Sequence, residues 1–177
     1  FVGNSAISDG KLEKRIKENK PKNPFYGWIS GGGTYKESEF EEDAAKIVEY
    51  NQNHGYPQAR VGQPDVKTLE DTKDGKTRWI QLRIPVTEGA RYRVGDFSVA
   101  GNTVVKSDAL TPLFKVKKGD WYNEKEIRDG LVKAREIYGA GGYMEFTGFP
   151  DLKLSDEPED NVPAALAAPP AAGPPTA

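Results

Sequence analysis

The sequence predicts an α+β fold of two consecutive β-α-α-β-β repeats, each a three-stranded sheet covered by two helices, with the second repeat lacking its last strand. Three observations predict it. The chain matches itself at fixed offsets, helical and strand periodicities alternate within each copy, and the second copy ends in an acidic and then Pro/Ala-rich stretch. We expect repeats at 1–90, with a truncated opening strand, and at 91–154, followed by a disordered tail or truncated loop at 155–177.

Two glycine-containing pairs mark the repeat. They are Gly3 and Asn4, which match Gly101 and Asn102 at an offset of 98 residues, and Gly55 and Tyr56, which match Gly142 and Tyr143 at 87. The difference between the offsets places an eleven-residue insertion in the first copy, in a stretch rich in proline and glycine. The Gly-Asn pairs are expected to form turns with positive φ, and the tyrosine rings to pack against the preceding helix.

Each copy contains a long amphipathic helix with a shorter one before it. Apolar residues recur at helical spacing over residues 37–54, and Ser38 with Glu41 has the pattern of a capping box. In the second copy Asn123 is the expected cap, and glycines follow the last apolar residue. The shorter helices are expected to start near Ser8 and near Ser107.

Alternating apolar and polar residues predict the strands. Residues 78–87 alternate in the way expected of a sheet with one buried face. Asp74 and Gly75 just upstream form a turn signal, so this strand should pair antiparallel with the strand that follows Tyr56. A further alternation from Tyr92 shifts phase at Gly95, where we expect a bulge or a restart of the strand. A second repeat without its closing strand should be marginally stable or borrow a strand.

Composition excludes several classes of function. Lys and Arg number 25 against 27 Asp and Glu, and they are scattered, so we expect no nucleic-acid partner. No run approaches the roughly 18 apolar residues of a membrane-spanning helix. The chain contains no Cys, which excludes disulfides and thiolate sites. It begins at Phe1 without a signal-peptide pattern, so we expect a processed or excised segment.

The residue pattern gives little support for catalysis. His54 is the single histidine and lies at an expected helix end, where it suits a capping role. The acidic run Glu41, Glu42 and Asp43 is expected to be a solvated face at a helix start rather than a metal site. Three consecutive glycines at 31–33 lack the Lys-Ser/Thr of a phosphate loop. We therefore expect no catalytic residue, no cofactor and no metal.

The order strand, Gly-Asn, helix, helix, Gly-Tyr, strand, and strand ending in Glu88 and Gly89 resembles the POTRA (polypeptide-transport-associated) domain of outer-membrane protein assembly factors. The resemblance covers residues 1 to about 154. The second copy departs from the first in having Gly130 at the position of Asp43, and it has no Glu-Gly strand end. The resemblance implies that residues 155–177 are a loop between the last two strands of the second repeat and that the chain is cut inside this loop. The strand that ends in Glu-Gly would then follow Ala177.

The resemblance implies a non-enzymatic periplasmic module of an outer-membrane protein. Its implied partners are unfolded outer-membrane proteins, accessory assembly lipoproteins and the C-terminal β-barrel of the same full-length chain. Two alternatives stay open: the POTRA region of a two-partner secretion or organellar import channel, and a spacer arm that binds no client. An enzyme would need a pocket with converging titratable groups.

A three-stranded sheet has two exposed edges, and an extended peptide can add to such an edge through main-chain hydrogen bonds. The resemblance implies that the strand after each Gly-Tyr pair is the edge used. The expected peptide-binding residues are Ala59, Arg60, Val61, Gly62 and Gln63 in the first copy, and Glu145, Phe146, Thr147 and Gly148 in the second. The alternative is an edge that is merely tolerated, protected by Pro57, Pro64 and the charge of Arg60.

Overall fold

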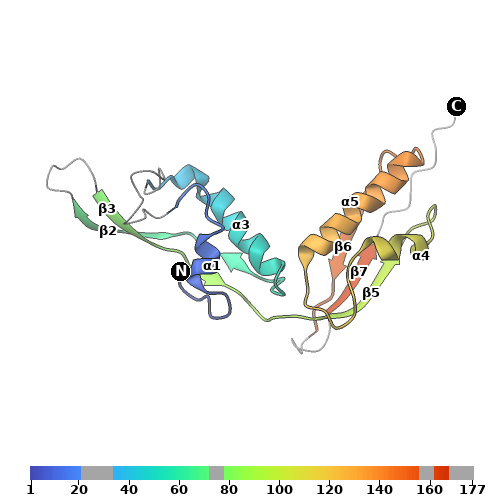
Figure 1. Ribbon diagram of the computed structural model, residues 1–177, viewed down its shortest axis with the longest axis horizontal. Helices are drawn as coiled ribbons and strands as arrows, with labels where there is room; N and C mark the ends of the chain where they lie inside the picture. Colours follow the sequence, from blue (N-terminus) through green and yellow to red (C-terminus); the bar gives the residue numbers. More distant parts are fainter. Residues whose placement is uncertain (21–33, 72–77, 156–161, 168–177) are drawn as a thin grey trace. The chain divides into compact units, whose positions relative to one another are not determined.

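The computed structural model describes residues 1–20, 34–71, 78–155 and 162–167 (Figure 1). The chain divides into two compact units. Unit 1 comprises Phe1–Asn51 with Gln58–Gly89, and unit 2 comprises Gln52–Pro57 with Ala90–Ala177. Each unit combines helices with paired strands, which confirms the predicted α+β fold class.

In unit 1 the other strands pair with residues 78–87, which we call the central segment and which contain β3 (Arg78–Arg83) and β4 (Val86–Thr87). β1 (Arg60–Val61) lies antiparallel to β4, and β2 (Asp65–Asp71) lies antiparallel to β3. On the other side of the central segment, Val2 forms a parallel bridge with Pro85, so the start of the chain takes the place of an opening strand. The predicted antiparallel pairing is confirmed, whereas the predicted turn at Asp74 and Gly75 lies outside the described residues.

The helices of unit 1 are α1 (Asp9–Glu13), the 3-10 turn η1 (Glu37–Glu39) and α3 (Phe40–Gln52). Ser38 lies inside η1, whose N-cap position is Lys36, so the predicted capping box is wrong. The 3-10 turn moves the start of the α-helix past Ser38. The apolar faces close on the sheet in a core of Ile7, Leu12, Ile16, Phe40, Ile47, Ile84 and Val86.

Unit 2 repeats this helix order with α4 (Ser107–Leu110), the 3-10 turn η2 (Thr111–Leu113) and α5 (Glu124–Ala140). The Asn123 side chain accepts a hydrogen bond from the Lys125 backbone nitrogen at 3.1 Å, so the predicted cap of the long helix is confirmed. The core consists of Leu110, Phe114, Tyr122, Ile127, Ala134 and Tyr138, together with Tyr92 and Val94.

The sheet of unit 2 contains the strand that the sequence prediction omitted. β5 (Val94–Ala100), β7 (Val162–Ala167) and β6 (Phe149–Leu152) lie in that order, with β7 parallel to β5 and antiparallel to β6. The expectation of a missing closing strand and an unstructured tail is therefore wrong over these six residues. Main-chain groups of β5 and β6 offer partners on both sides, and this tertiary context overrides a Pro/Ala-rich composition.

The predicted irregularity near Gly95 has a structural counterpart. The register between β5 and β7 shifts between Val94 and Phe97, and Pro163 is the β7 residue that falls within the shift. Because proline has no N–H to donate, a ladder tolerates it where pairing is interrupted. A bulge in β5 therefore accommodates a proline in a central strand.

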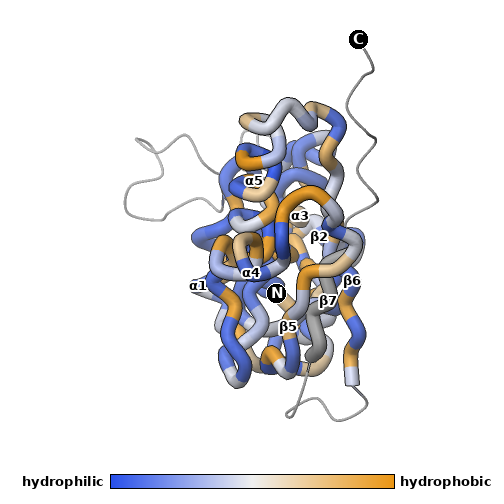
Figure 2. The backbone as a smooth tube through the Cα atoms, turned by 90° about the vertical axis from the view of Figure 1, so that its right-hand side faces the viewer, coloured by the Kyte–Doolittle hydropathy of each residue, from blue (hydrophilic) through white to orange (hydrophobic). Residues whose placement is uncertain are grey.

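Along the backbone, short hydrophobic stretches alternate with hydrophilic ones (Figure 2). Within the described ranges, no helix combines the length and apolar character needed to cross a bilayer.

Candidate functional site: exposed sheet edges

The strands that follow the two long helices form edges of their sheets. In unit 1, β1 pairs only with β4 and β2 only with β3, so the opposite side of each has no strand partner among the described residues. In unit 2, β6 pairs only with β7. Figure 1 shows the β2–β3 hairpin continuing past α3 within unit 1. An unpaired edge presents N–H and C=O groups that an extended chain can use.

The residues predicted for the first edge lie in and beside β1. Arg60 and Val61 form the strand, while Ala59 just before it is buried. The Gly62 backbone nitrogen donates to the Pro85 carbonyl oxygen at 2.9 Å, so this N–H is directed into the sheet. Gln63 is exposed, and its N–H has no acceptor in the described part of the chain. An outside strand thus finds a free donor at Gln63.

Sequence reasoning missed that the edge continues through β2. Val66 and Leu69 on this strand are 46% and 54% exposed, and the register shift between Thr68 and Glu70 leaves Leu69 without a paired residue. Large apolar side chains on an edge strand add contact area to main-chain pairing. The signal in the sequence is the alternation of Val66 and Thr68 with polar residues, directly after Pro64.

In unit 2 the predicted edge residues come before the edge strand. Glu145 lies in a turn, and Thr147 and Gly148 precede β6, which begins at Phe149. The Phe146 ring stacks on Tyr138 of α5 with centroids 4.3 Å apart. A side chain at Gly148 would come within 2.8 Å of Leu131 Cδ2, so this stretch fills space under α5. The edge strand itself carries Phe149, which is 53% exposed.

A buried carboxylate fixes the end of the central segment in unit 1. Glu88 follows β4, is 6% exposed, and accepts hydrogen bonds from the backbone nitrogens of residues 5–7 at 2.8–2.9 Å. The Ser5 hydroxyl donates to the same carboxylate at 3.2 Å. Burial raises the pKa of Glu88, but these hydrogen bonds outweigh burial and hold the pKa below its usual range. We call residues 5–7 the carboxylate nest of unit 1.

Asp43 has a similar role at the other end of α1. It is 1% exposed and accepts from the backbone nitrogens of Lys17, Glu18 and Asn19 at 2.7, 3.1 and 2.8 Å. Burial raises the pKa of Asp43, and the hydrogen bonds lower it further than burial raises it. The expectation that Asp43 belongs to a solvated acidic face is therefore wrong, because its carboxylate replaces water as the acceptor for a loop.

The Gly-Asn pairs form equivalent turns in the two units. Gly3 and Gly101 have φ of +93° and +77°. Asn4 Nδ2 donates to the Ile7 carbonyl oxygen at 2.8 Å, and Asn102 Nδ2 donates to the Val105 carbonyl oxygen at 2.7 Å. Each asparagine also donates to the side chain five residues further along: Asn4 to the Asp9 carboxylate and Asn102 to the Ser107 hydroxyl. The repeat is thus preserved at the level of single hydrogen bonds.

The Gly-Tyr pairs end the long helices. Gly55 and Gly142 have φ of +102° and +87°, a conformation that favours glycine. The Tyr143 ring meets Tyr138 edge-on at 6.1 Å, and Tyr56 is buried.

Across the described ranges, no group of three or more His, Asp or Glu side chains is placed to hold a metal ion.

Comparison with known proteins places this architecture. A family model described as "Surface antigen variable number repeat", the POTRA model, matches residues 1–89 and again residues 92–162. The chain belongs to the POTRA family. Its two units are POTRA repeats of the kind found in BamA.

The relatives are outer-membrane assembly factors. The chain is 31% identical over 144 residues to the outer membrane protein assembly factor BamA of Neisseria meningitidis, which covers 81% of this chain. It is 27% identical over 143 residues to a putative outer membrane protein assembly factor of Treponema pallidum. The chain spans only 17% and 16% of the lengths of these relatives.

Solved structures agree on the fold. The crystal structure of Haemophilus influenzae BamA POTRA3-5 matches with a TM-score of 0.72 at 22% identity, covering 95% of this chain and 63% of that one. BamA from Haemophilus ducreyi lacking POTRA domains 1–3 matches with a TM-score of 0.60 at 16% identity, covering 88% and 28%.

Proposed function

We propose that this POTRA pair is a non-enzymatic interaction module that binds unfolded β-barrel precursor segments by strand addition to its exposed edges. The observation that carries the proposal is the β1–β2 edge of unit 1. This edge pairs on one side only, offers the free N–H of Gln63, and displays Val66 and Leu69. Main-chain pairing tolerates many sequences, which suits a receptor for many clients.

The relatives support the cellular setting of this proposal. They carry the name of an outer membrane protein assembly factor, so we place the module in the periplasm as part of an outer-membrane protein. Its further partners would be accessory assembly lipoproteins and a C-terminal β-barrel of the same full-length chain. The competing functions are a POTRA region of a two-partner secretion or organellar import channel, and a spacer arm without client binding.

The test is an NMR titration of the labelled chain with an extended peptide taken from an outer-membrane barrel strand. Two variants make a matched pair. Gln63→Pro removes the free edge donor, and Gln63→Ala removes the same side chain but keeps the N–H. Gln63 is exposed and lies outside β1 and β2, and the Gln63→Ala variant separates loss of the side chain from loss of the N–H.

Strand addition predicts amide shifts along β1 and β2 in the native chain and in Gln63→Ala, with weaker binding in Gln63→Pro. Shifts that persist with scrambled peptides would support a general receptor. If millimolar peptide shifts no amide of β1, β2 or β6, the edge does not bind clients, and the spacer function gains support.

A further inference from the structure

Two arginines of unit 2 stack on one tryptophan. Arg93 forms an antiparallel bridge with Trp121, and Tyr92 between the arginines is buried in the core, which leaves Arg91 and Arg93 on the opposite face. The guanidinium carbon of Arg91 lies 3.7 Å from the centroid of the Trp121 ring, and that of Arg93 lies 3.8 Å from it. Two cations therefore share one indole ring.

Hydrogen bonds to the main chain hold both guanidinium groups in place. Arg91 Nε donates to the His54 carbonyl oxygen at 3.1 Å. Residues 52–57 belong to unit 2, so this contact is internal to the unit. Arg93 Nη1 donates to the Gly119 carbonyl oxygen at 2.8 Å. Because both side chains are already oriented, a ligand that binds them loses less conformational freedom on binding.

Each guanidinium group keeps donors that no protein group uses. Both terminal nitrogens of Arg91, and Nε and Nη2 of Arg93, have no acceptor in the part of the chain that the structure describes. Among the described residues, no carboxylate forms an ion pair with either arginine. Arg91 is exposed and Arg93 is half-buried, so a ligand can reach these donors. An anion that bridges them would offset the repulsion between the two positive charges.

The turn beside the stack adds positive charge. Lys117 and Lys118 directly precede Gly119 and are exposed. Lys118 pairs with Asp96 at 3.2 Å, whereas Lys117 has no ion-pair partner within the described ranges. Residues 91–96 and 117–121 together contain four Lys and Arg against two Asp. The excess of positive charge attracts anions to this part of unit 2.

The number of donors distinguishes between classes of anion. A single guanidinium group already matches the two oxygens of a carboxylate. A phosphate group has enough oxygens to accept from two guanidinium groups at once. The paired arginines therefore favour phosphate over a carboxylate.

We propose that Arg91, Trp121 and Arg93 form a binding site in unit 2 for a phosphate group, either free or carried by a lipid headgroup. The site is separate from the β1–β2 edge, and it does not rest on strand addition there.

The first experiment is an NMR titration of the labelled full chain with inorganic phosphate at constant pH and ionic strength. Saturable shifts are expected at the Trp121 indole N–H and at the amides of residues 91–93 and 119–121. Arg91→Gln should weaken binding by about tenfold, because a hydrogen bond to a charged group contributes at least the corresponding free energy. Arg91→Lys keeps the charge but loses the planar pair of donors, so it should also weaken binding.

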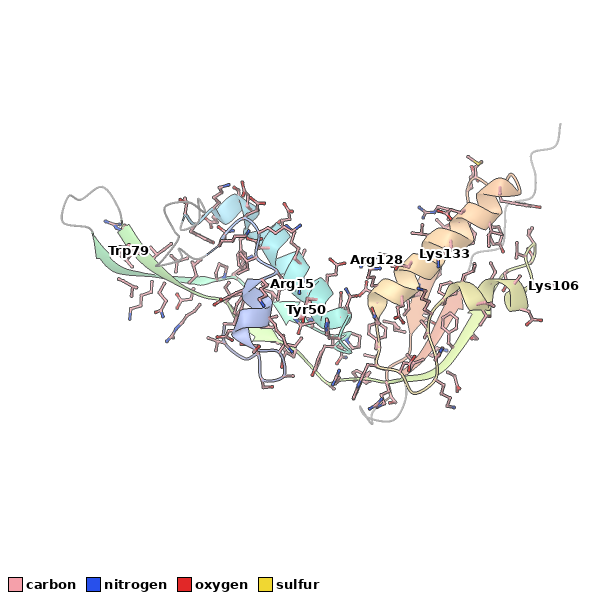
Figure 3. The ribbon with its side chains drawn as sticks, viewed as in Figure 1. Arg15, Tyr50, Trp79, Lys106, Arg128 and Lys133 are labelled. Carbon is pink, nitrogen blue, oxygen red and sulfur yellow. The ribbon has the colours of Figure 1, made fainter. Side chains whose placement is uncertain are left out.

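Lys133 on α5 provides the control for charge alone (Figure 3). It is exposed and forms no ion pair with the described residues, so Lys133→Gln removes the same charge as Arg91→Gln. Lys133→Gln should bind phosphate as the native chain does. Unchanged amide signals in the rest of unit 2 confirm that each variant is folded.

The second experiment measures co-sedimentation with vesicles of phosphatidylglycerol and phosphatidylcholine, with pure phosphatidylcholine as the reference. Binding to the anionic vesicles that is lost in Arg91→Gln and kept in Lys133→Gln identifies a lipid headgroup as the ligand. Phosphate shifts without vesicle binding identify free phosphate.

Three results would overturn the site. The first is the absence of both saturable phosphate shifts and Arg91-dependent vesicle binding. The second is equal weakening by Arg91→Gln and Lys133→Gln, which would show attraction by charge alone. The third is tighter binding of a diglutamate peptide than of phosphate, which would assign the arginines to an acidic peptide instead.

Discussion

The carboxylate of Glu88 lies 2.8 Å from the backbone nitrogen of Ile7, a residue 81 positions earlier in the chain. This contact joins the end of the central segment to the turn that leads into α1. Neighbouring hydrogen bonds to Ser5 and Ala6 make the carboxylate the common acceptor for the whole turn. The Glu-Gly strand end is therefore a structural clamp of unit 1.

Replacing Glu88 with Gln should destabilise unit 1 by about 1.5–3 kcal/mol, because hydrogen bonds to a buried charged acceptor are replaced by weaker ones and one amide donor is left unpaired. Chemical denaturation followed by NMR signals of unit 1 measures the change. Glu13→Gln, at an exposed position of α1, is the control and should leave stability within about 0.5 kcal/mol of the native chain. An equal effect of both variants would argue against the clamp.

Acid should weaken unit 1 through both buried carboxylates. The folded-state pKa values of Asp43 and Glu88 are lowered below their usual ranges. Their stabilisation is thus present above the unfolded values, near pH 4, and is lost as pH falls through the lower folded values. The denaturant midpoint should change little from neutral pH to about pH 4 and should decrease as the pH is lowered further. In the double variant Asp43→Asn, Glu88→Gln this decrease of the midpoint with pH should be smaller. An unchanged decrease would assign the acid sensitivity to other groups.

Equivalent positions of the two long helices, α3 and α5, make different contacts in the two units. Asp43 of α3 binds the loop after Ile16, whereas the equivalent position of α5 is Gly130, which receives the ring of Phe114. A Cβ at Gly130 would lie 2.6 Å from Phe114 Cγ. In unit 2 the packing of the Phe114 ring against Gly130 thus takes the place of the hydrogen bonds that the Asp43 carboxylate accepts in unit 1.

Gly130→Ala should therefore lower the stability of unit 2 by about 1–3 kcal/mol, since the added methyl group would overlap the buried ring of Phe114. Gly139→Ala, in the same helix, meets no atom within 4 Å and should gain up to about 1 kcal/mol from helix propensity. Thermal unfolding of both variants gives the comparison. Stabilisation by both alanines would show that the ring does not need the glycine.

A third glycine substitution tests the turn that opens unit 1. Gly3 has φ of +93°, and a Cβ there would lie 2.5 Å from the Val86 carbonyl oxygen. Gly3→Ala should cost more than about 1 kcal/mol, from backbone strain and a contact with main chain that cannot yield. Gly10→Ala, which meets nothing within 4 Å, is the matched control. Similar melting temperatures for the two variants would contradict this account.

Local patterns in the sequence predicted much of the fold. The self-match located both Gly-Asn turns, periodicity located α3 and α5, and the cap at Asn123 followed from residue type. These features depend on residues within a few positions of one another. The β3 and β4 strands and their antiparallel partner also followed from alternation and a turn signal.

The features that escaped prediction are set by distant contacts. No local pattern shows that Asp43 is buried or that Glu88 reaches Ile7 across 81 residues. The composition of residues 162–167 argues against a strand, and only the open positions on β5 and β6 make one favourable. For the edge strands, the sequence indicated the position of β1. It predicted the second edge strand at residues 145–148, whereas β6 begins at Phe149 because Phe146 packs on Tyr138.

The most direct test of client binding by strand addition is amide hydrogen exchange at Gln63 with and without a saturating barrel-strand peptide. Gln63 is an exposed residue whose N–H has no acceptor in the described part of the chain, whereas the N–H of Gly62 already donates to the Pro85 carbonyl oxygen. Strand addition predicts at least about tenfold slower exchange at Gln63 on binding, with little change at Gly62. Peptide binding that leaves Gln63 exchanging at its free rate would contradict main-chain pairing at this edge.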